Sequence, residues 1–341
     1  MSRLHPQAGP DGKPPGTTSW QRSITEAGTE MRSYYGRPVL KKPVWSWEVP
    51  TYFFTGGLAG ASSVLAGAAR LAGNERLSRA ALFVGAAADL VSPALLVSDL
   101  GRPERFHHMF RVVKPTSPMN VGSWVLLVSG GASNTAAVLR LLGRLPRLAR
   151  AAETVSTLAG PLLATYTGVL VADTAIPVWH EGRRELPWIF GASAAASAGA
   201  AACTVVPPGE AGPARRLALA GVLGEGMLMQ AMQRRLGSVG EVYRQGAAGR
   251  LSRAAQALAG TGSALLATSG RRRRAAAALG GALVCGGELC LRWAVFRAGF
   301  QSARDPKYVV ERQRERAARD GTRATTMPGG SAGSGAPGAS S

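Results

Sequence analysis

Residues 49–69 read VPTYFFTGGLAGASSVLAGAA and contain no charged side chain. A helix needs about 20 predominantly apolar residues to cross the hydrocarbon core of a bilayer, and this run is long enough. Small residues recur in it around Gly56, Gly57 and Gly60. Such residues let helix backbones approach closely where lipid provides no hydrophobic drive for association. The run therefore predicts a transmembrane helix packed against a neighbouring helix.

Further apolar runs of similar length follow along the chain. The predicted spans are residues 49–72, 78–98, 121–142, 153–176, 187–206, 214–233, 252–270 and 275–297. We expect an all-α integral membrane bundle of about eight transmembrane helices, arranged in two four-helix halves. This domain is predicted to cover residues 36–310. It lies between a disordered N-terminal tail, 1–35, and a C-terminal tail, 311–341, that is basic and then rich in Gly, Ala and Ser.

Charge is segregated from these spans. The chain has a net charge of +20, which taken alone would favour nucleic acid or an anionic surface as a partner. Its arginines gather between the apolar runs, because a charge at the bilayer centre is costly. We therefore expect contact with lipid headgroups and no nucleic acid. The segments on the same side of the membrane as the termini hold more Arg and Lys than the loops on the opposite side. This favours a multi-pass cell-membrane protein with cytoplasmic termini.

Histidine and cysteine offer no site for a tightly bound redox metal. The histidines are His5, His107, His108 and His180. None lies in the middle of a span, so facing helices supply no axial ligands for a b-type haem. The cysteines are Cys203, Cys285 and Cys290. Their spacing matches no metal-binding motif, and we expect neither haem nor another metal to be bound by this chain.

Acidic residues occur within the predicted spans, where carboxylates are rare and face a bundle interior or a water-filled cavity. They are Asp89, Asp173, Glu225 and Glu288. Arg292 follows Glu288 by one helical turn, a spacing at which the two can pair. The functional interpretation is a proton path or a polar ligand site. The structural alternative is a set of protonated or paired side chains that hold helices together.

Two segments at the membrane boundary combine aromatic and polar side chains. Residues 45–54 gather Trp and Tyr around Glu48. This is either an interfacial aromatic belt or the wall of a pocket in which a ring-shaped, lipid-soluble ligand meets a proton-accepting carboxylate. Residues 99–120 repeat apolar side chains at helical spacing from Phe106 to Val113, which predicts a short interfacial helix. Its basic face is alternatively a site for lipid headgroups.

Three motifs together resemble the NrfD family, the membrane subunits of polysulfide reductase-like complexes. They are Trp47-Glu48-x-Pro50-x-Tyr52-Phe53-Phe54-x-Gly56-Gly57, Asp99-Leu-Gly-Arg102-Pro-x-Arg105-Phe, and Lys114-Pro-x-Ser-Pro-Met-x-x-Gly122-Ser-Trp124. The segments 166–179 and 305–310 are similar to the family as well. The likeness covers residues 35–310.

The resemblance implies a quinone-reactive, non-catalytic or quinone-site subunit of an oxidoreductase in a respiratory chain. Family members bind a quinone near one face of a haem-free bundle and dock a ferredoxin-like iron–sulfur subunit. That partner often relays electrons to or from a molybdopterin catalytic subunit. Electrons would pass between the partner's cluster and menaquinone or ubiquinone, with associated proton transfer.

The resemblance also assigns candidate residues. The pocket candidates are Glu48, Tyr52, Asp99, Arg102, His107, His108 and Lys114. Glu48 or a loop histidine is expected to accept the proton, while Tyr52 and Arg102 orient the ring oxygens. Asp89 and Asp173 are expected to serve proton movement.

A proton-coupled small-solute transporter is the alternative function. Carriers also contain intramembrane acids and proline-interrupted spans, and Pro93 and Pro161 interrupt two spans here. A structural anchor that binds the same partners without quinone chemistry is a third possibility. Co-purification with an iron–sulfur protein would favour the first function, and substrate uptake by the chain alone would favour the second.

Overall fold

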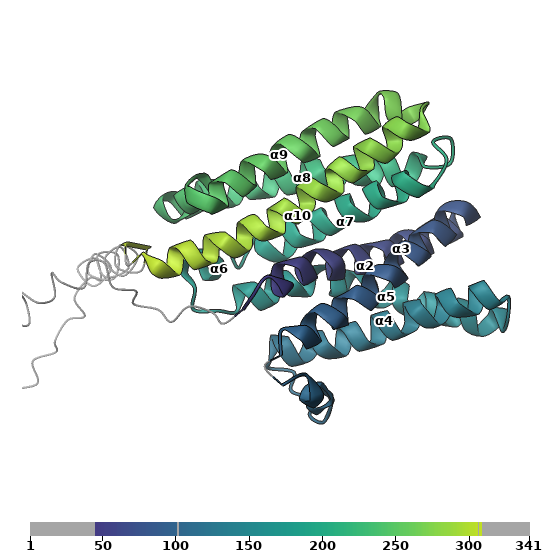
Figure 1. Ribbon diagram of the computed structural model, residues 1–341, viewed down its shortest axis with the longest axis horizontal. Coiled ribbons are helices and arrows are strands. Elements are labelled where there is room, and N and C mark those ends of the chain that lie inside the picture. Colours follow the sequence, from purple (N-terminus) through teal and green to yellow (C-terminus); the bar gives the residue numbers. More distant parts are fainter. Residues whose placement is uncertain (1–44, 101, 306, 309–341) are drawn as a thin grey trace, which may run out of the picture. The chain divides into compact units, whose positions relative to one another are not determined.

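The computed structural model describes residues 45–100, 102–305 and 307–308. The predicted tails, 1–35 and 311–341, lie outside these residues. Within the described ranges all regular secondary structure is helical, which confirms the all-α prediction. The long helices are α2 (Glu48–Leu71), α3 (Glu75–Ser98), α4 (Pro118–Leu142), α5 (Pro146–Ala172), α7 (Leu186–Val205), α8 (Gly212–Leu236), α9 (Gly246–Ala267) and α10 (Arg274–Arg304) (Figure 1).

Each predicted span coincides with one of these long helices. The helices long and apolar enough to cross a membrane are α3, α4, α5, α7 and α10. Helices α2, α8 and α9 are of similar length but are not among these, so a total of eight spans stays a prediction. Short elements occupy the connections: η2 (Pro103–Phe110), α6 (Pro177–Glu181), η3 (Gly237–Arg244) and η4 (Ser269–Arg271). The 3₁₀-helix η2 is the predicted short helix of the loop.

Local sequence signals set the helix ends. Helices α4 and α5 begin at Pro118 and Pro146, where the missing N–H of proline costs no hydrogen bond. The Asn74 side chain accepts a hydrogen bond from the backbone N–H of Leu77 at 3.0 Å and so caps α3. Helix α4 stops at Gly143, which adopts the left-handed conformation that glycine tolerates.

The helices pack in two groups. Helices α2 to α5 contact one another, α7 to α10 form the second group, and α7 contacts both α2 and α5. In Figure 1 the first group occupies the lower part of the bundle and the second the upper part. The two predicted four-helix halves are therefore present. Short connections bring η2, α6 and η3 to the end where α3, α5, α8 and α10 finish, which we call the η2 end.

Helices α2 and α5 cross in backbone contact. A Cβ atom added to Gly60 would lie 2.5 Å from the carbonyl oxygen of Gly160, and one added to Gly160 would lie 2.5 Å from that of Gly60. Neither position has room for a side chain. The glycine-rich run of α2 therefore packs against a neighbouring helix as the sequence predicts.

At the opposite end of the bundle, one buried carboxylate joins three helices. Glu153 of α5 is 1% exposed, and its Oε2 accepts hydrogen bonds from Arg70 of α2 and from Arg140 of α4, the latter at 2.9 Å. Arg140 also lies 3.7 Å from Glu75 of α3. This cluster fixes the ends of α2, α4 and α5 relative to one another.

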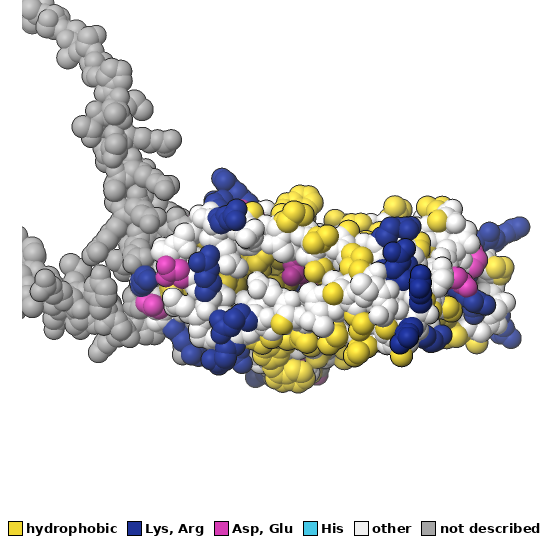
Figure 2. Space-filling model, turned by 90° about the horizontal axis from the view of Figure 1, so that it is seen from above, with side chains coloured by type: hydrophobic (Ala, Val, Ile, Leu, Met, Phe, Trp, Pro, Cys, Tyr) yellow, Lys and Arg dark blue, Asp and Glu magenta, His cyan; other side chains and the backbone are white. Residues whose placement is uncertain are grey.

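The surface repeats the charge segregation of the sequence. On the face that Figure 2 shows, Lys and Arg gather towards the two ends of the bundle, and uncharged side chains form the belt between them. An acidic side chain lies in a hollow within that belt. A belt without Lys or Arg is what the hydrocarbon core requires of a membrane protein.

Replacing Gly60 by leucine should destabilise the bundle. The new side chain has to push α5 away, and overpacking costs about 1–3 kcal/mol or more. We expect a lower midpoint of thermal unfolding in detergent. Gly260→Ala is the control, because a Cβ there meets no atom within 4 Å. An unchanged midpoint for Gly60→Leu would contradict the close crossing.

Glu153→Ala should also destabilise the protein. Removing one partner from a buried ion pair costs about 3–5 kcal/mol, and the lower end applies because Arg70 and Arg140 retain some exposure. The exposed pair of Glu210 and Arg76 is the control, since such pairs contribute about 0–1 kcal/mol. Thermal unfolding of Glu153→Ala and Glu210→Ala should therefore differ clearly, and equal midpoints would refute the structural role of Glu153.

Candidate functional site

A cavity of about 120 Å³ lies near the η2 end, between α2, α3, α4 and α5. Its walls are mostly apolar and aromatic. The polar side chains that line it are Tyr52, Asp99, Ser123 and Tyr166. This combination of an apolar wall with a few polar groups is typical of a small-molecule site.

Tyr52 presents an unsatisfied hydroxyl group in this cavity. The side chain is 0% exposed, and its hydroxyl oxygen has no hydrogen-bond partner within the described part of the chain. Tyr166 faces it, with the ring centroids 6.4 Å apart. A buried polar group without a partner is costly, so a ligand oxygen beside Tyr52 would be stabilised.

Gly122 makes room for Tyr166. A Cβ atom at Gly122 of α4 would lie 2.1 Å from ring atom Cε2 of Tyr166. Any larger residue would have to displace the ring from the cavity wall. The glycine of the third sequence motif is thus explained by the position of an aromatic ring on α5.

Two carboxyl groups meet at the edge of the cavity through one hydroxyl group. Glu48 is the first residue of α2, and Asp99 directly follows α3. The Ser46 hydroxyl contacts a carboxylate oxygen of both, and the Ser46 backbone N–H donates to Asp99 at 3.4 Å. One hydroxyl has one proton and donates to one carboxylate only. The Ser46 side chain joins the two acidic side chains at the cavity edge.

A second, larger cavity adjoins the first. It has a volume of about 320 Å³ and is lined by residues of α3, α4 and η2. Both cavities share Leu96, Met109 and Ser123 as lining residues. Phe106 and Phe110 of η2 also line the larger one, so the apolar face predicted for the loop helix covers this cavity.

Asp89 lies in that apolar lining. It is 2% exposed, and its Oδ2 accepts a hydrogen bond from the Ser133 hydroxyl of α4. Its Oδ1 has no partner among the residues that the structure describes. The prediction of a buried carboxylate within this span is thereby confirmed.

The structure brings together some of the predicted site residues and separates others. Tyr52 and Asp99 line one cavity, Glu48 joins Asp99 through Ser46, and Asp89 lines the adjoining cavity. The remaining loop candidates are exposed and line neither cavity: Arg102, His107, His108 and Lys114. The rings of His107 and His108 stack edge to face, 4.3 Å apart.

Asp173 lies outside the membrane-spanning helix to which it was assigned. Helix α5 ends at Ala172, and Asp173 is an exposed residue that follows it. The predicted span continued to residue 176. Pro177 disfavours helical geometry at Ile176, which is extended with ψ 123°, so the helix does not continue to that residue.

Tyr166 was not assigned to the site from the sequence, whereas Trp45 belongs to the aromatic segment that was predicted as a possible pocket wall. Tyr166 occurred in a segment that resembles the family, but nothing in its local pattern pointed into the cavity. Trp45 lines the cavity and stacks on Trp179, with centroids 5.6 Å apart. The Nε1 of Trp179 donates to the Val295 carbonyl at 2.8 Å, so a residue of α6 holds the segment that precedes α2 against α10.

Glu288 and Arg292 interact electrostatically but do not form the direct ion pair that their spacing allows. Arg292 donates from Nη2 to the carbonyl oxygen of Phe190 at 2.8 Å, and its guanidinium lies 3.9 Å from the centroid of the Phe190 ring. The side chain thus extends towards α7 rather than back along α10.

Comparison with known families gives one match. The family model NrfD_2, described as polysulfide reductase, matches residues 31–305. No curated protein matches the chain.

Proposed function

The chain belongs to the polysulfide reductase family of NrfD-type membrane subunits, and from this premise we propose that it is the quinone-reactive subunit of its complex. Family membership makes it a multi-pass membrane subunit of an oxidoreductase complex. In our proposal it exchanges electrons between a quinone or quinol in the membrane and a ferredoxin-like iron–sulfur subunit. A molybdopterin subunit carries out the terminal reaction.

The pair of adjoining cavities carries this proposal. A quinone combines a small ring that has two oxygen acceptors with a long apolar tail. An engineered apolar cavity of about 150 Å³ binds benzene, so the cavity of about 120 Å³ suits a single ring. The adjoining apolar cavity of about 320 Å³ suits the first part of a tail. The unpaired Tyr52 hydroxyl supplies a donor for a ring oxygen.

The chain's own residues then have distinct roles. Tyr52 donates to one ring oxygen, and Tyr166 bounds the opposite wall. Asp99 exchanges a proton at the cavity edge, and the Ser46 hydroxyl relays it to Glu48 at the start of α2. A bound quinone contributes two-electron chemistry that is coupled to the uptake or release of protons. The expected quinone is ubiquinone, which has one ring, or menaquinone, whose second fused ring would extend into the adjoining cavity.

The exposed candidates belong to the surface beside the cavity. Arg102, His107, His108 and Lys114 lie on the segment that covers this end of α3 and α4. Their charge suits contact with a partner subunit or lipid headgroups, and the histidines are placed to move protons between solvent and the cavity edge. Asp173, at the end of α5, is proposed to move protons between solvent and the bundle. Asp89 is the proposed proton carrier beside the apolar cavity.

Glu48→Gln should slow quinol turnover in the assembled complex while leaving membrane insertion intact, because glutamine keeps the shape of the side chain but cannot relay a proton. The rate of quinol oxidation with a saturating electron acceptor measures this. Glu210→Gln, at the opposite end of the bundle, is the control. Wild-type turnover in Glu48→Gln would remove Glu48 from the mechanism.

Tyr52→Phe should weaken quinone binding with less effect on the maximal rate. The change removes a single hydrogen bond, which is worth about 0.5–1.5 kcal/mol, or up to roughly tenfold in affinity. The KM for quinol and the Kd from quinone titration should rise together. Unchanged values for both would place the ring elsewhere in the protein.

A further inference from the structure

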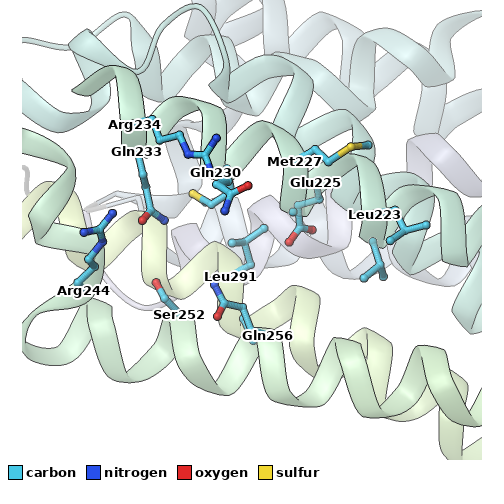
Figure 3. Close-up of a pocket in the computed structure, with 14 residues that line it drawn as sticks. Leu223, Glu225, Met227, Gln230, Gln233, Arg234, Arg244, Ser252, Gln256 and Leu291 are labelled. Carbon is cyan, nitrogen blue, oxygen red and sulfur yellow. The ribbon is translucent and has the colours of Figure 1, made fainter. Parts of the chain in front are cut away.

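A separate pocket lies in the second half of the bundle. It has a volume of about 640 Å³ and lies between α8, α9 and η3 (Figure 3). Gln230 and Gln233 of α8 face Ser252 and Gln256 of α9 across it, and the Glu225 carboxyl group points into the same space. Arg234 and Arg244 line the part towards the η2 end. Apolar side chains of α8, α9 and α10 complete the lining, and the polar groups among them offer hydrogen-bond partners to water.

Glu225 meets a second carboxyl group beneath the pocket. Glu288 of α10 is 0% exposed, and its carboxyl lies within hydrogen-bonding reach of Glu225. The Ser193 hydroxyl of α7 donates to Glu288 Oε2 at 2.6 Å. Oε1 of Glu288 and Oε2 of Glu225 receive no donor from any described residue. A proton shared between the two carboxyl groups would give a partner to each of the oxygens that it joins.

Charge balance sets the number of protons. Arg292 is 1% exposed, interacts electrostatically with both acids, and keeps Nε and Nη1 without a partner within the described ranges. One buried cation balances one carboxylate, and an unbalanced charge in a low-dielectric interior is costly. The cluster is neutral when Glu225 and Glu288 together hold a single proton.

The groups that face the pair come from every surrounding helix. On α10 they are Arg292 and the Cys285 thiol, and on α7 the Ser193 hydroxyl. Helix α9 contributes the uncharged Ser252 and Gln256 to the pocket, and the cations of α8 and η3, Arg234 and Arg244, lie towards its η2 end. On the far side, Gly57 of α2 adjoins the Arg292 guanidinium.

We propose that Glu225 and Glu288 form a proton-binding site that holds one shared proton and exchanges it with water through the pocket between α8 and α9. The ligand is the proton itself, delivered by hydronium or water to a carboxylate oxygen, and no electron is transferred. The site lies apart from the cavities between α2 and α5. It requires neither a quinone nor a partner subunit, so its test is independent of the function proposed above.

Carbodiimide labelling tests the shared proton. Dicyclohexylcarbodiimide adds to a protonated carboxyl group in an apolar setting and rearranges to a stable acylurea that mass spectrometry locates. At about pH 7 exposed glutamates, with a pKa of about 4.3, are ionised and react little. We expect the full-length protein in lipid nanodiscs to carry an adduct on Glu225 or on Glu288, but not on both in one molecule.

Single substitutions separate a shared proton from two independently protonated acids. In Glu225→Gln the remaining acid is balanced by Arg292 and becomes ionised, so the adduct on Glu288 should be lost. Glu288→Gln should likewise abolish the adduct on Glu225, and Glu210→Gln should change neither. Thermal unfolding checks that each variant is folded. A folded wild type without either adduct, or an adduct that persists on the remaining acid, would overturn the shared site.

Hydrogen–deuterium exchange of the protonated carboxyl group tests access through the pocket. In wild type the infrared carbonyl band of this acid should shift soon after transfer to D2O. Gln256→Phe narrows the pocket with an apolar ring and should slow the shift several-fold, whereas Leu279→Phe on the exposed surface of α10 should not. Equal exchange rates in the wild type and Gln256→Phe would exclude this route for water.

Discussion

The backbone contact between Gly60 of α2 and Gly160 of α5 is the constraint on which the first half of the bundle depends. In a bilayer, lipid tails are as apolar as the helix surface, so association relies on close packing. The contact places the N-terminal part of α2 beside the C-terminal part of α5. Tyr52 and Tyr166 therefore face one another and bound the ring-sized cavity. Gly122 allows similarly close packing between α4 and α5, since only a residue without a side chain leaves room for the Tyr166 ring.

Acidic side chains within this bundle lie in three different environments, which depend on their position along the helices. Glu153, near the end opposite to η2, is balanced by arginines from two other helices and acts as a structural tie. Glu48 and Asp99, near the η2 end, share a hydroxyl group and border a cavity. Glu225 and Glu288 lie near the middle of their helices, where the dielectric is lowest, and Arg292 is the cation that interacts with both of them. Acidic side chains thus tie helices together at one end, and in our proposals they bind protons elsewhere.

The positions of the helices follow from the apolar runs of the sequence, but the lengths of those runs do not give the helix ends. Charge segregation marks the part of a helix that lies in the hydrocarbon core, and each predicted span coincides with a helix. The predicted span began at 153 because Arg147 and Arg150 are typical of a loop. The helix itself begins at Pro146 and includes both arginines. Helix α10 likewise extends to Arg304. The length of an apolar run therefore predicts the part of a helix that spans the membrane, but it underestimates the full length of these helices.

The candidate site was predictable only in part, for a related reason. Tyr52 and Asp99 belong to contiguous motifs, and both line the same cavity. Tyr166 and Ser46 contribute through contacts between elements distant in sequence, which no local pattern reveals. The pocket between α8 and α9 was also not foreseen, because its polar residues are spread over two helices and a turn. Arg102, His107 and His108 lie in a conspicuous motif, yet their side chains are exposed.

Photoaffinity labelling with an azidoquinone tests the central claim, that a quinone ring occupies the cavity between α2, α3, α4 and α5. The labelled chain is digested, and the adducts are located by mass spectrometry with and without an excess of unmodified quinone. We predict adducts, suppressed by the excess quinone, on peptides that contain Tyr52, Met109 or Tyr166. Adducts confined to α7–α10, or labelling that excess quinone does not reduce, would contradict that location.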